Sequence, residues 1–129
     1  MSSRETALAF VDAINKHSVG AIGDLITDDH VLVDSLGALV EGRDAIRNAW
    51  IEYFYLVPDF TIHCDHVFEG ADMVALFGTA DGTCRIGARI DPQNHWSMPA
   101  SWLAGVHGGR VVRWQVFADN EPVRKILGA

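Results

Sequence analysis

The chain has 129 residues and a formal charge of −7, from 10 Lys and Arg against 17 Asp and Glu. Its length is typical of one domain, so residues 1–129 are expected to form a single unit, and 49% hydrophobic residues argue against disorder. The acidic balance and the scattered basic residues argue against nucleic-acid binding. No apolar run approaches the ~20 residues that span a bilayer, so we expect a cytoplasmic protein without a membrane partner.

The first half of the chain predicts helices. Apolar residues at helical spacing behind a Ser2–Glu5 capping-box pair predict a helix over about residues 3–16. Ser18 is placed to cap a second, shorter helix that ends before Thr27. A strongly amphipathic helix is expected from Gly42 to Val57, where it ends because the residue before a proline is disfavoured in the α region.

The second half of the chain predicts strands. Five segments carry strand patterns, over about residues 31–34, 60–69, 73–85, 95–107 and 110–118. Gly87 to Asn94 is expected to be irregular, and Glu121 to Leu127 to form a final short helix. Helices followed by long antiparallel strands predict an α+β fold.

The fourth predicted strand, over about residues 95–107, carries apolar residues on both faces. Trp96 and Trp102 share one face, whereas Pro99 and Leu103 share the other. We therefore expect helices to cover one face of the sheet and a second copy of the chain to cover the outer face, in a homodimer. Pro99 is expected at a bulge or a strand edge, because it cannot donate a hydrogen bond to a ladder.

The cysteines and histidines do not predict a metal site. Cys64 and Cys84 lack the spacing of zinc ligands and are interpreted as buried thiols, although a disulfide between them is an alternative. His63 and His66 look like a ligand pair, but strand alternation is expected to turn them to opposite faces.

Three segments resemble the NTF2-like superfamily, in its SnoaL-like and ketosteroid-isomerase-like branch. They read ALAFVDAINKH, TDDHVLVDSLGALVEGRDAIRNAW and GGRVVRWQVFADNEPVRKIL, and the similarity covers nearly the whole chain. The resemblance implies a cone-shaped NTF2-like (cystatin-like) fold, with helices packed on a curved, mainly antiparallel sheet. It also implies an apolar pocket at the wide end of the cone, which would bind a small hydrophobic ligand.

The resemblance implies a general base but a depleted oxyanion site. Asp34 falls where isomerases of this branch carry their base. Phe10 falls where they carry the tyrosine that hydrogen-bonds the oxyanion, and Ser101 aligns near their second oxyanion donor. Each lost donor costs about 10²–10³ in rate, so steroid isomerisation by the mechanism of these enzymes is disfavoured. Val116 likewise stands where related epoxide hydrolases carry an acid.

Five further residues are site candidates beside Asp34 and Ser101. Asp34 itself has an alternative interpretation, as a cap for the turn that follows it. His66 is predicted to line the pocket as a proton shuttle or, equally, to be a hydrogen-bonded core residue. Aromatic residues of the core become pocket wall in a cone, so three of them are ligand-contact candidates: Phe10, Trp50 and Phe54. Asp119 is a ligand-contact candidate that could instead cap the last helix.

These observations favour a cofactor-independent acid–base enzyme, of isomerase, polyketide-cyclase or lyase type. Asp34 would move a proton on a small apolar carbonyl compound, and Ser101 together with His66 or a water would stabilise the enolate. The alternative is a non-catalytic module for small-molecule binding or dimerisation. No cofactor or metal is expected.

Overall fold

The computed structural model describes residues 1–128. Its helices are α1 (Ser3–Asn15), α2 (Val19–Leu25), α3 (Arg43–Leu56) and α4 (Glu121–Leu127). Its strands are β1 (Ile26–Val33), β2 (Leu39–Glu41), β3 (Thr61–Glu69), β4 (Met73–Ile86), β5 (Arg89–His107) and β6 (Arg110–Ala118). None of the helices within this range is both long and apolar enough to cross a membrane.

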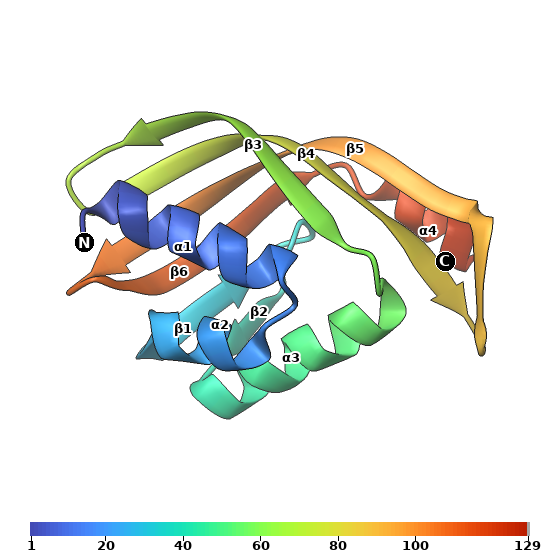
Figure 1. Ribbon diagram of the computed structural model, residues 1–129, viewed down its shortest axis with the longest axis horizontal. Helices are drawn as coiled ribbons and strands as arrows, with labels where there is room; N and C mark the ends of the chain where they lie inside the picture. Colours follow the sequence, from blue (N-terminus) through green and yellow to red (C-terminus); the bar gives the residue numbers. More distant parts are fainter. Residues whose placement is uncertain (129) are drawn as a thin grey trace.

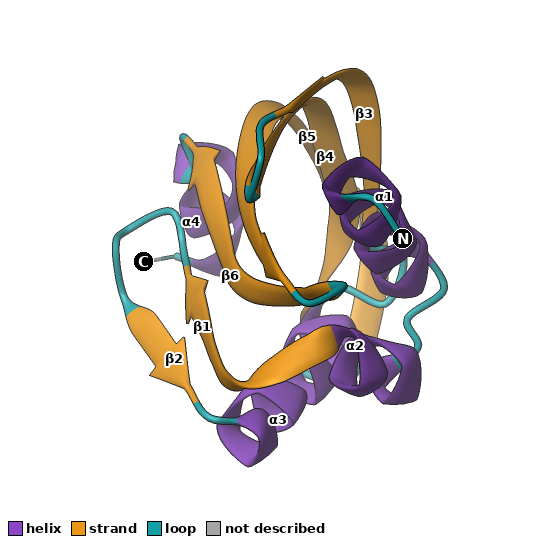
Figure 2. Cartoon of the chain, turned by 90° about the vertical axis from the view of Figure 1, so that its left-hand side faces the viewer, coloured by secondary structure: helices purple, strands orange, loops and turns teal. Residues whose placement is uncertain are grey.

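The strands form one curved sheet in the order β2-β1-β6-β5-β4-β3 (Figure 1). All neighbours pair antiparallel except β1 and β6, which run parallel, so the sheet is mixed. The sheet does not close into a barrel, and α1 lies inside its curve (Figure 2). The α+β fold with helices on a curved, mainly antiparallel sheet is confirmed.

The helices begin and end where local chemistry predicts. The Ser2 hydroxyl accepts the Glu5 N–H while the Glu5 carboxylate accepts the Ser2 N–H, which completes the capping box of α1. Ser18 caps α2 by accepting the N–H of Ala21. The last residue of α3 is Leu56, since Val57 precedes a proline and leaves the helical region.

Two strand starts and one additional strand differ from the sequence-based expectation. β1 begins at Ile26 rather than near residue 31, and the short strand β2 pairs with it through a turn at Gly37. β5 begins at Arg89, so the stretch expected to be irregular belongs mostly to a hairpin with β4. Gly87, with φ of 60°, makes the tight turn of that hairpin, which lets Ile86 pair with Arg89.

Pro99 occupies an edge position, as expected. Its β4 partner is Thr79, but pairing of β5 with β6 begins only at Ala100, opposite Ala118. Pro99 therefore has no ladder neighbour on the β6 side, where its missing N–H costs nothing.

The core fills the concave side of the sheet. Phe10 is fully buried, with its ring centroid 4.9 Å from that of Trp114 and 6.4 Å from that of Trp50. His30 of β1 is also fully buried, and its Nδ1 lies 2.7 Å from the Val111 carbonyl oxygen, to which it must donate. Burial lowers the pKa of the His30 imidazole below its usual value. A neutral histidine is therefore part of the core.

Candidate functional site

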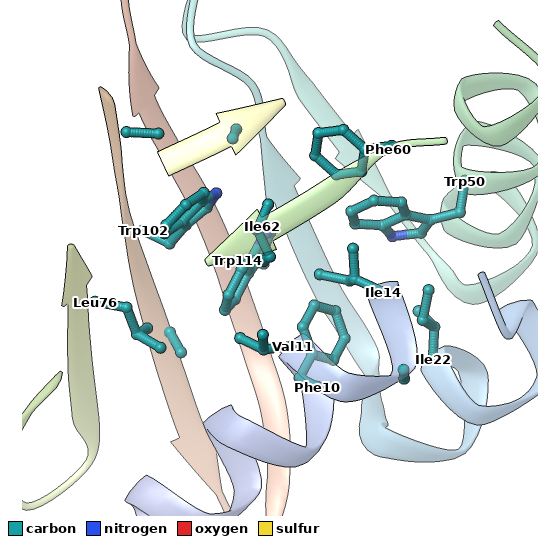
Figure 3. Close-up of a cluster of buried hydrophobic side chains, with 14 of the residues drawn as sticks. Phe10, Val11, Ile14, Ile22, Trp50, Phe60, Ile62, Leu76, Trp102 and Trp114 are labelled. Carbon is teal, nitrogen blue, oxygen red and sulfur yellow. The ribbon is translucent and has the colours of Figure 1, made fainter. Parts of the chain in front are cut away.

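A cavity of about 320 Å³ lies between the sheet, α1, α3 and the start of α4. Its lining is mainly apolar, and all four tryptophans of the chain contribute to it: Trp50, Trp96, Trp102 and Trp114. Figure 3 shows Trp50 projecting from α3 between Phe60 and Ile14, which also line the cavity. The volume and the flat aromatic walls suit a small, mostly apolar ligand.

A few polar residues interrupt the apolar lining. Asp34 and Ser35 enter it from the end of β1, Asn120 from the start of α4, and Tyr53 from α3. Asp34 is the only acidic residue among the described residues that line the cavity. The polar groups therefore come from separate segments that the fold brings to one space, an arrangement typical of ligand sites.

Asp34 combines both interpretations of its side chain. Its Oδ1 accepts the N–H of Leu36 at 2.9 Å and the N–H of Ala38 at 2.9 Å, so it caps the turn between β1 and β2. Its Oδ2 accepts no hydrogen bond from the residues in the structure's described range, and the residue lines the cavity. The turn therefore orients the carboxylate and leaves one oxygen available.

Tyr53 stands one helical turn after Trp50 and lines the same wall. Its ring meets that of Trp50 edge-on, with centroids 6.4 Å apart, and that of Phe60 edge-on at 4.9 Å. Burial, with a smaller contribution from Cys84, raises the pKa of the Tyr53 phenol far above its usual value. The phenol is therefore a hydrogen-bond donor at any physiological pH.

Two indole N–H groups of the lining are also buried. The Nε1 atoms of Trp50 and Trp96 have no hydrogen-bond partner within 1–128 that meets ordinary geometry. The Trp96 N–H nevertheless lies close enough to the Cys84 sulfur to favour its thiolate slightly, although burial dominates and raises the pKa of Cys84. Cys64 and Cys84 are both free thiols, as their spacing predicted, but only Cys84 is buried, whereas Cys64 is partly buried.

His66 does not face the cavity, because a β-bulge breaks the alternation of β3. Cys64 pairs with Gly78 but His66 pairs with Phe77, so one extra residue stands on β3 between them. The bulge reverses the direction of every later side chain on this strand. His66 is exposed, and its ring stacks near that of Phe68 on the outer face, so its predicted place in the pocket is wrong.

The same bulge corrects the interpretation of His63. His63 and His66 both lie on the outer face, since their β4 partners Thr79 and Phe77 share one side of that strand. The two imidazoles are therefore not on opposite faces. In the described part of the chain no three His, Cys, Asp or Glu side chains are grouped to hold a metal ion.

Ser101 also lies outside the cavity. It alternates with Ala100 and Trp102, which are buried and line the cavity, and it pairs with Phe77 on one side and Phe117 on the other. Both phenylalanines are exposed on the outer face. The structure therefore does not bring Ser101 together with Asp34, and an enolate in the cavity is beyond its reach.

The remaining candidates take different places. Trp50 lines the cavity as predicted, whereas Phe10 is packed beneath it and is not part of the lining. Phe54 stacks on His17, with ring centroids 4.1 Å apart, and is likewise not among the lining residues. Asp119 is exposed, and its Oδ1 accepts the N–H of Glu121 at 3.0 Å at the start of α4.

Sequence reasoning missed Tyr53 and Asn120 as site residues. Tyr53 belongs to the apolar stripe of α3, three residues after Trp50, and a phenol within such a stripe is a signal for a polar group in a pocket wall. Asn120 carries no such signal. It reaches the cavity only because α4 folds back against β4 and β5.

The comparisons with known proteins agree with this architecture. The sequence profile of the family described as "SnoaL-like domain" matches residues 7–114. No functionally curated protein matches the chain.

Solved structures share the fold at low identity. A candidate SnoaL-like polyketide cyclase from Shewanella denitrificans OS-217 superposes with a TM-score of 0.84 at 15% identity, covering 98% of this chain and 96% of its own. IdmH, a candidate polyketide cyclase from Streptomyces antibioticus, has a TM-score of 0.81 at 20% identity, covering 100% of both chains. A hypothetical protein with a ketosteroid isomerase-like fold from Catenulispora acidiphila DSM 44928, in complex with trimethylamine, has a TM-score of 0.81 at 18% identity, covering 96% and 92%. These likenesses establish the fold.

Proposed function

Because the chain belongs to the SnoaL-like domain family, we propose that it is a cofactor-independent acid–base enzyme of isomerase, cyclase or lyase type. Its substrate is a small apolar carbonyl compound that binds in the cavity. The observation that supports this proposal is the position of Asp34, a carboxylate at the edge of a cavity whose other walls are mainly aromatic and aliphatic. The fold alone would not support it, since one fold hosts many activities.

In this proposal Asp34 removes a proton from the carbon next to the substrate carbonyl. Oδ1 is held by the N–H groups of Leu36 and Ala38, so Oδ2 takes the proton while the electron pair moves onto the carbonyl oxygen as an enolate. Return of that proton to another carbon isomerises the substrate. Attack of the enolate carbon on a second carbonyl of the same molecule closes a ring instead, and the alkoxide formed takes the proton back from Asp34 Oδ2.

Proton exchange tests the proposal without knowledge of the natural substrate. The protein is incubated in D2O with 2-tetralone, a bicyclic apolar ketone, and deuterium entry beside the carbonyl is followed by NMR. Asp34→Asn keeps an oxygen for the turn but loses the basic carboxylate, so exchange is expected to fall about 10²–10⁴-fold.

Asp91→Asn is the matched control. The Asp91 Oδ1 also accepts the N–H of the residue two positions on, Gln93, at 3.0 Å, but Asp91 does not line the cavity. Exchange should be unchanged in this variant. Equal exchange by the wild type and Asp34→Asn would exclude Asp34 as the base, and binding of 2-tetralone without any exchange would favour the non-catalytic binding module.

We also propose a homodimer through the outer sheet face. One row across this face, set by the strand register, carries His66, Phe77, Ser101 and Phe117. Phe77 and Phe117 are 44% and 47% exposed, and Phe68 beside them is 61% exposed, an apolar patch that water disfavours. Light scattering should report a dimer at micromolar concentration and a monomer for Phe77→Asp. A monomeric wild type would contradict the proposal.

A further inference from the structure

The cavity contains a hydrogen-bond donor that the protein itself leaves free. Tyr53 lines the cavity between Trp50 and Phe60, and its two ring contacts are edge-on packing contacts rather than polar ones. Its hydroxyl makes no hydrogen bond to any residue in the described range 1–128. Tyr53 is only partly buried and its hydroxyl oxygen stays accessible, so the O–H is free to donate to a molecule that occupies the cavity.

A second donor beside it also lacks a partner within the described chain. Trp50 is 6% exposed, and its indole N–H is buried without a partner within the described chain. Tyr53 and Trp50 are three residues apart on α3 and are therefore neighbours on one helix face. The unpaired Trp50 N–H costs free energy in the empty protein, whereas the accessible Tyr53 hydroxyl binds water until a ligand oxygen replaces it.

The walls around Tyr53 in the described part of the chain offer its hydroxyl no bound acceptor, so the acceptor is a water or a ligand. The lining around Tyr53 is aromatic and aliphatic, with Phe60, Trp96 and Ala80 nearby in the cavity wall. Such a wall binds the apolar body of a ligand but gives its oxygen no other partner. The position of the Tyr53 hydroxyl would then determine which way the ligand lies.

We propose that Tyr53 donates the hydrogen bond that binds the carbonyl oxygen of the ligand and stabilises the enolate formed there. The inference rests on the proposed function, and it names the electrophilic partner of Asp34. The position is new relative to the isomerases that the chain resembles, since Phe10 occupies the place of their donor on the first helix. The donor is thus on α3, the helix whose Trp50 contributes to the same wall.

The ionisation of Tyr53 is consistent with this role. Burial raises the pKa of its phenol, so the O–H is retained throughout the neutral range and can only donate to an oxyanion. A hydrogen bond to an enolate oxygen is stronger than one to the neutral carbonyl because the acceptor is charged. Loss of the hydroxyl should therefore reduce the rate of proton abstraction more than the affinity for the ketone.

A matched pair of ligands separates this hydrogen bond from packing. 2-Acetylnaphthalene carries a carbonyl, and 2-ethylnaphthalene has nearly the same shape without one. In Tyr53→Phe the dissociation constant of the ketone should rise about 2- to 10-fold, the range for one hydrogen bond, while that of the hydrocarbon stays constant. The infrared carbonyl band of the bound ketone should move to higher frequency in this variant.

Tyr55→Phe is the control on the same helix. Tyr55 is 64% exposed, and its ring lies under the Arg85 guanidinium at 4.4 Å, a contact that phenylalanine preserves. This variant should change neither dissociation constant nor the carbonyl band.

The possible results distinguish the two proposals. An unchanged ketone affinity and carbonyl band in Tyr53→Phe, or an equal loss of both ligands, would overturn the assignment of Tyr53. Failure of the wild type to bind either ligand would overturn the proposed function and this assignment with it. The two assignments can also separate. If Tyr53→Phe weakens binding of the ketone alone while Asp34→Asn leaves deuterium exchange unchanged, Tyr53 is retained as the oxygen-binding residue and Asp34 is rejected as the base.

Discussion

Thr83 holds the carboxylate of Asp59 at both oxygens. Its main-chain N–H donates to Oδ1 at 2.6 Å, and its hydroxyl donates to Oδ2 at 2.7 Å. Because that hydroxyl proton is committed to Asp59, the 3.0 Å contact of Thr83 Oγ1 with His95 Nδ1 requires the histidine to donate. The three residues tie the segment before β3 to β4 and β5, next to Trp96 of the cavity wall.

Removing the Thr83 hydroxyl should destabilise the fold. Thr83→Val keeps the shape but removes the hydroxyl that joins Asp59 to His95. Because both of these residues are exposed and water can take its place, the expected loss is about 0.5–1.5 kcal/mol in the free energy of unfolding. Urea denaturation measures the change. Thr83→Ser should restore most of the loss, and Thr79→Val, on the outer face of the same strand, should have little effect. Equal stabilities for Thr83→Val and the wild type would show that the network contributes nothing.

Gly78 is required by the approach of β3 at the bulge. A Cβ at this position would lie 1.7 Å from the His63 carbonyl oxygen, a backbone atom that cannot rotate away. Gly78→Ala should therefore reduce the free energy of unfolding by about 3 kcal/mol. Gly20 lies in α2, and a Cβ added there would have no atom within 4 Å. Gly20→Ala should therefore be neutral or stabilising by about 0.5 kcal/mol. Similar unfolding midpoints for the two variants would contradict this explanation.

Filling the cavity should block binding without unfolding the protein. Ala100 lines the cavity, and Ala100→Leu places three additional carbon atoms in it. We expect binding of 2-ethylnaphthalene to weaken about tenfold or more, since overpacking a filled site costs about 1–3 kcal/mol. Ser97→Leu adds similar bulk to an exposed position of β5 that does not line the cavity, and calorimetry should show unchanged affinity. Undiminished binding by Ala100→Leu would place the ligand elsewhere.

The buried His30 predicts that stability falls in mild acid. Its pKa is lower in the folded protein than the ordinary value of about 6.5 that applies to the unfolded chain, so the unfolded chain binds more protons between the two values. This contribution to stability is complete above about pH 6.5 and is lost as the pH falls below it toward the folded pKa. The slope is at most about 1.4 kcal/mol per pH unit.

Urea denaturation at pH 7.5 and 5.5 tests the role of His30. In His30→Gln the amide can still donate to the Val111 carbonyl oxygen but does not titrate. The difference between the free energies of unfolding at pH 7.5 and 5.5 should therefore be smaller than in the wild type. His107→Gln, at an exposed site, should retain the full difference. The same pH dependence in His30→Gln and the wild type would assign the effect to another group.

The order of the helices and of every strand except the short β2 was predictable because it depends on local patterns. The capping box at Ser2, the helix end at Val57 and the strand over residues 110–118 follow from neighbouring residues, and the structure has all three. The place of Asp34 at the end of a strand was likewise predictable. Its side chain has one oxygen on the turn and the other free, so the two interpretations of this residue were not exclusive.

Which side chains share the cavity was decided by the tertiary structure. A single extra residue after Cys64 turns His66 to the outer face, and alternation along β3 does not reveal a bulge that arises from pairing with Gly78 and Phe77 on β4. Tyr53 and Asn120 meet around one space only when α3 and α4 pack against the curved sheet. The sequence by itself determined the elements and the acidic residue at the end of β1, because these depend on contacts close in the chain. The partners of that residue depend on contacts between distant segments, which only the packed sheet creates.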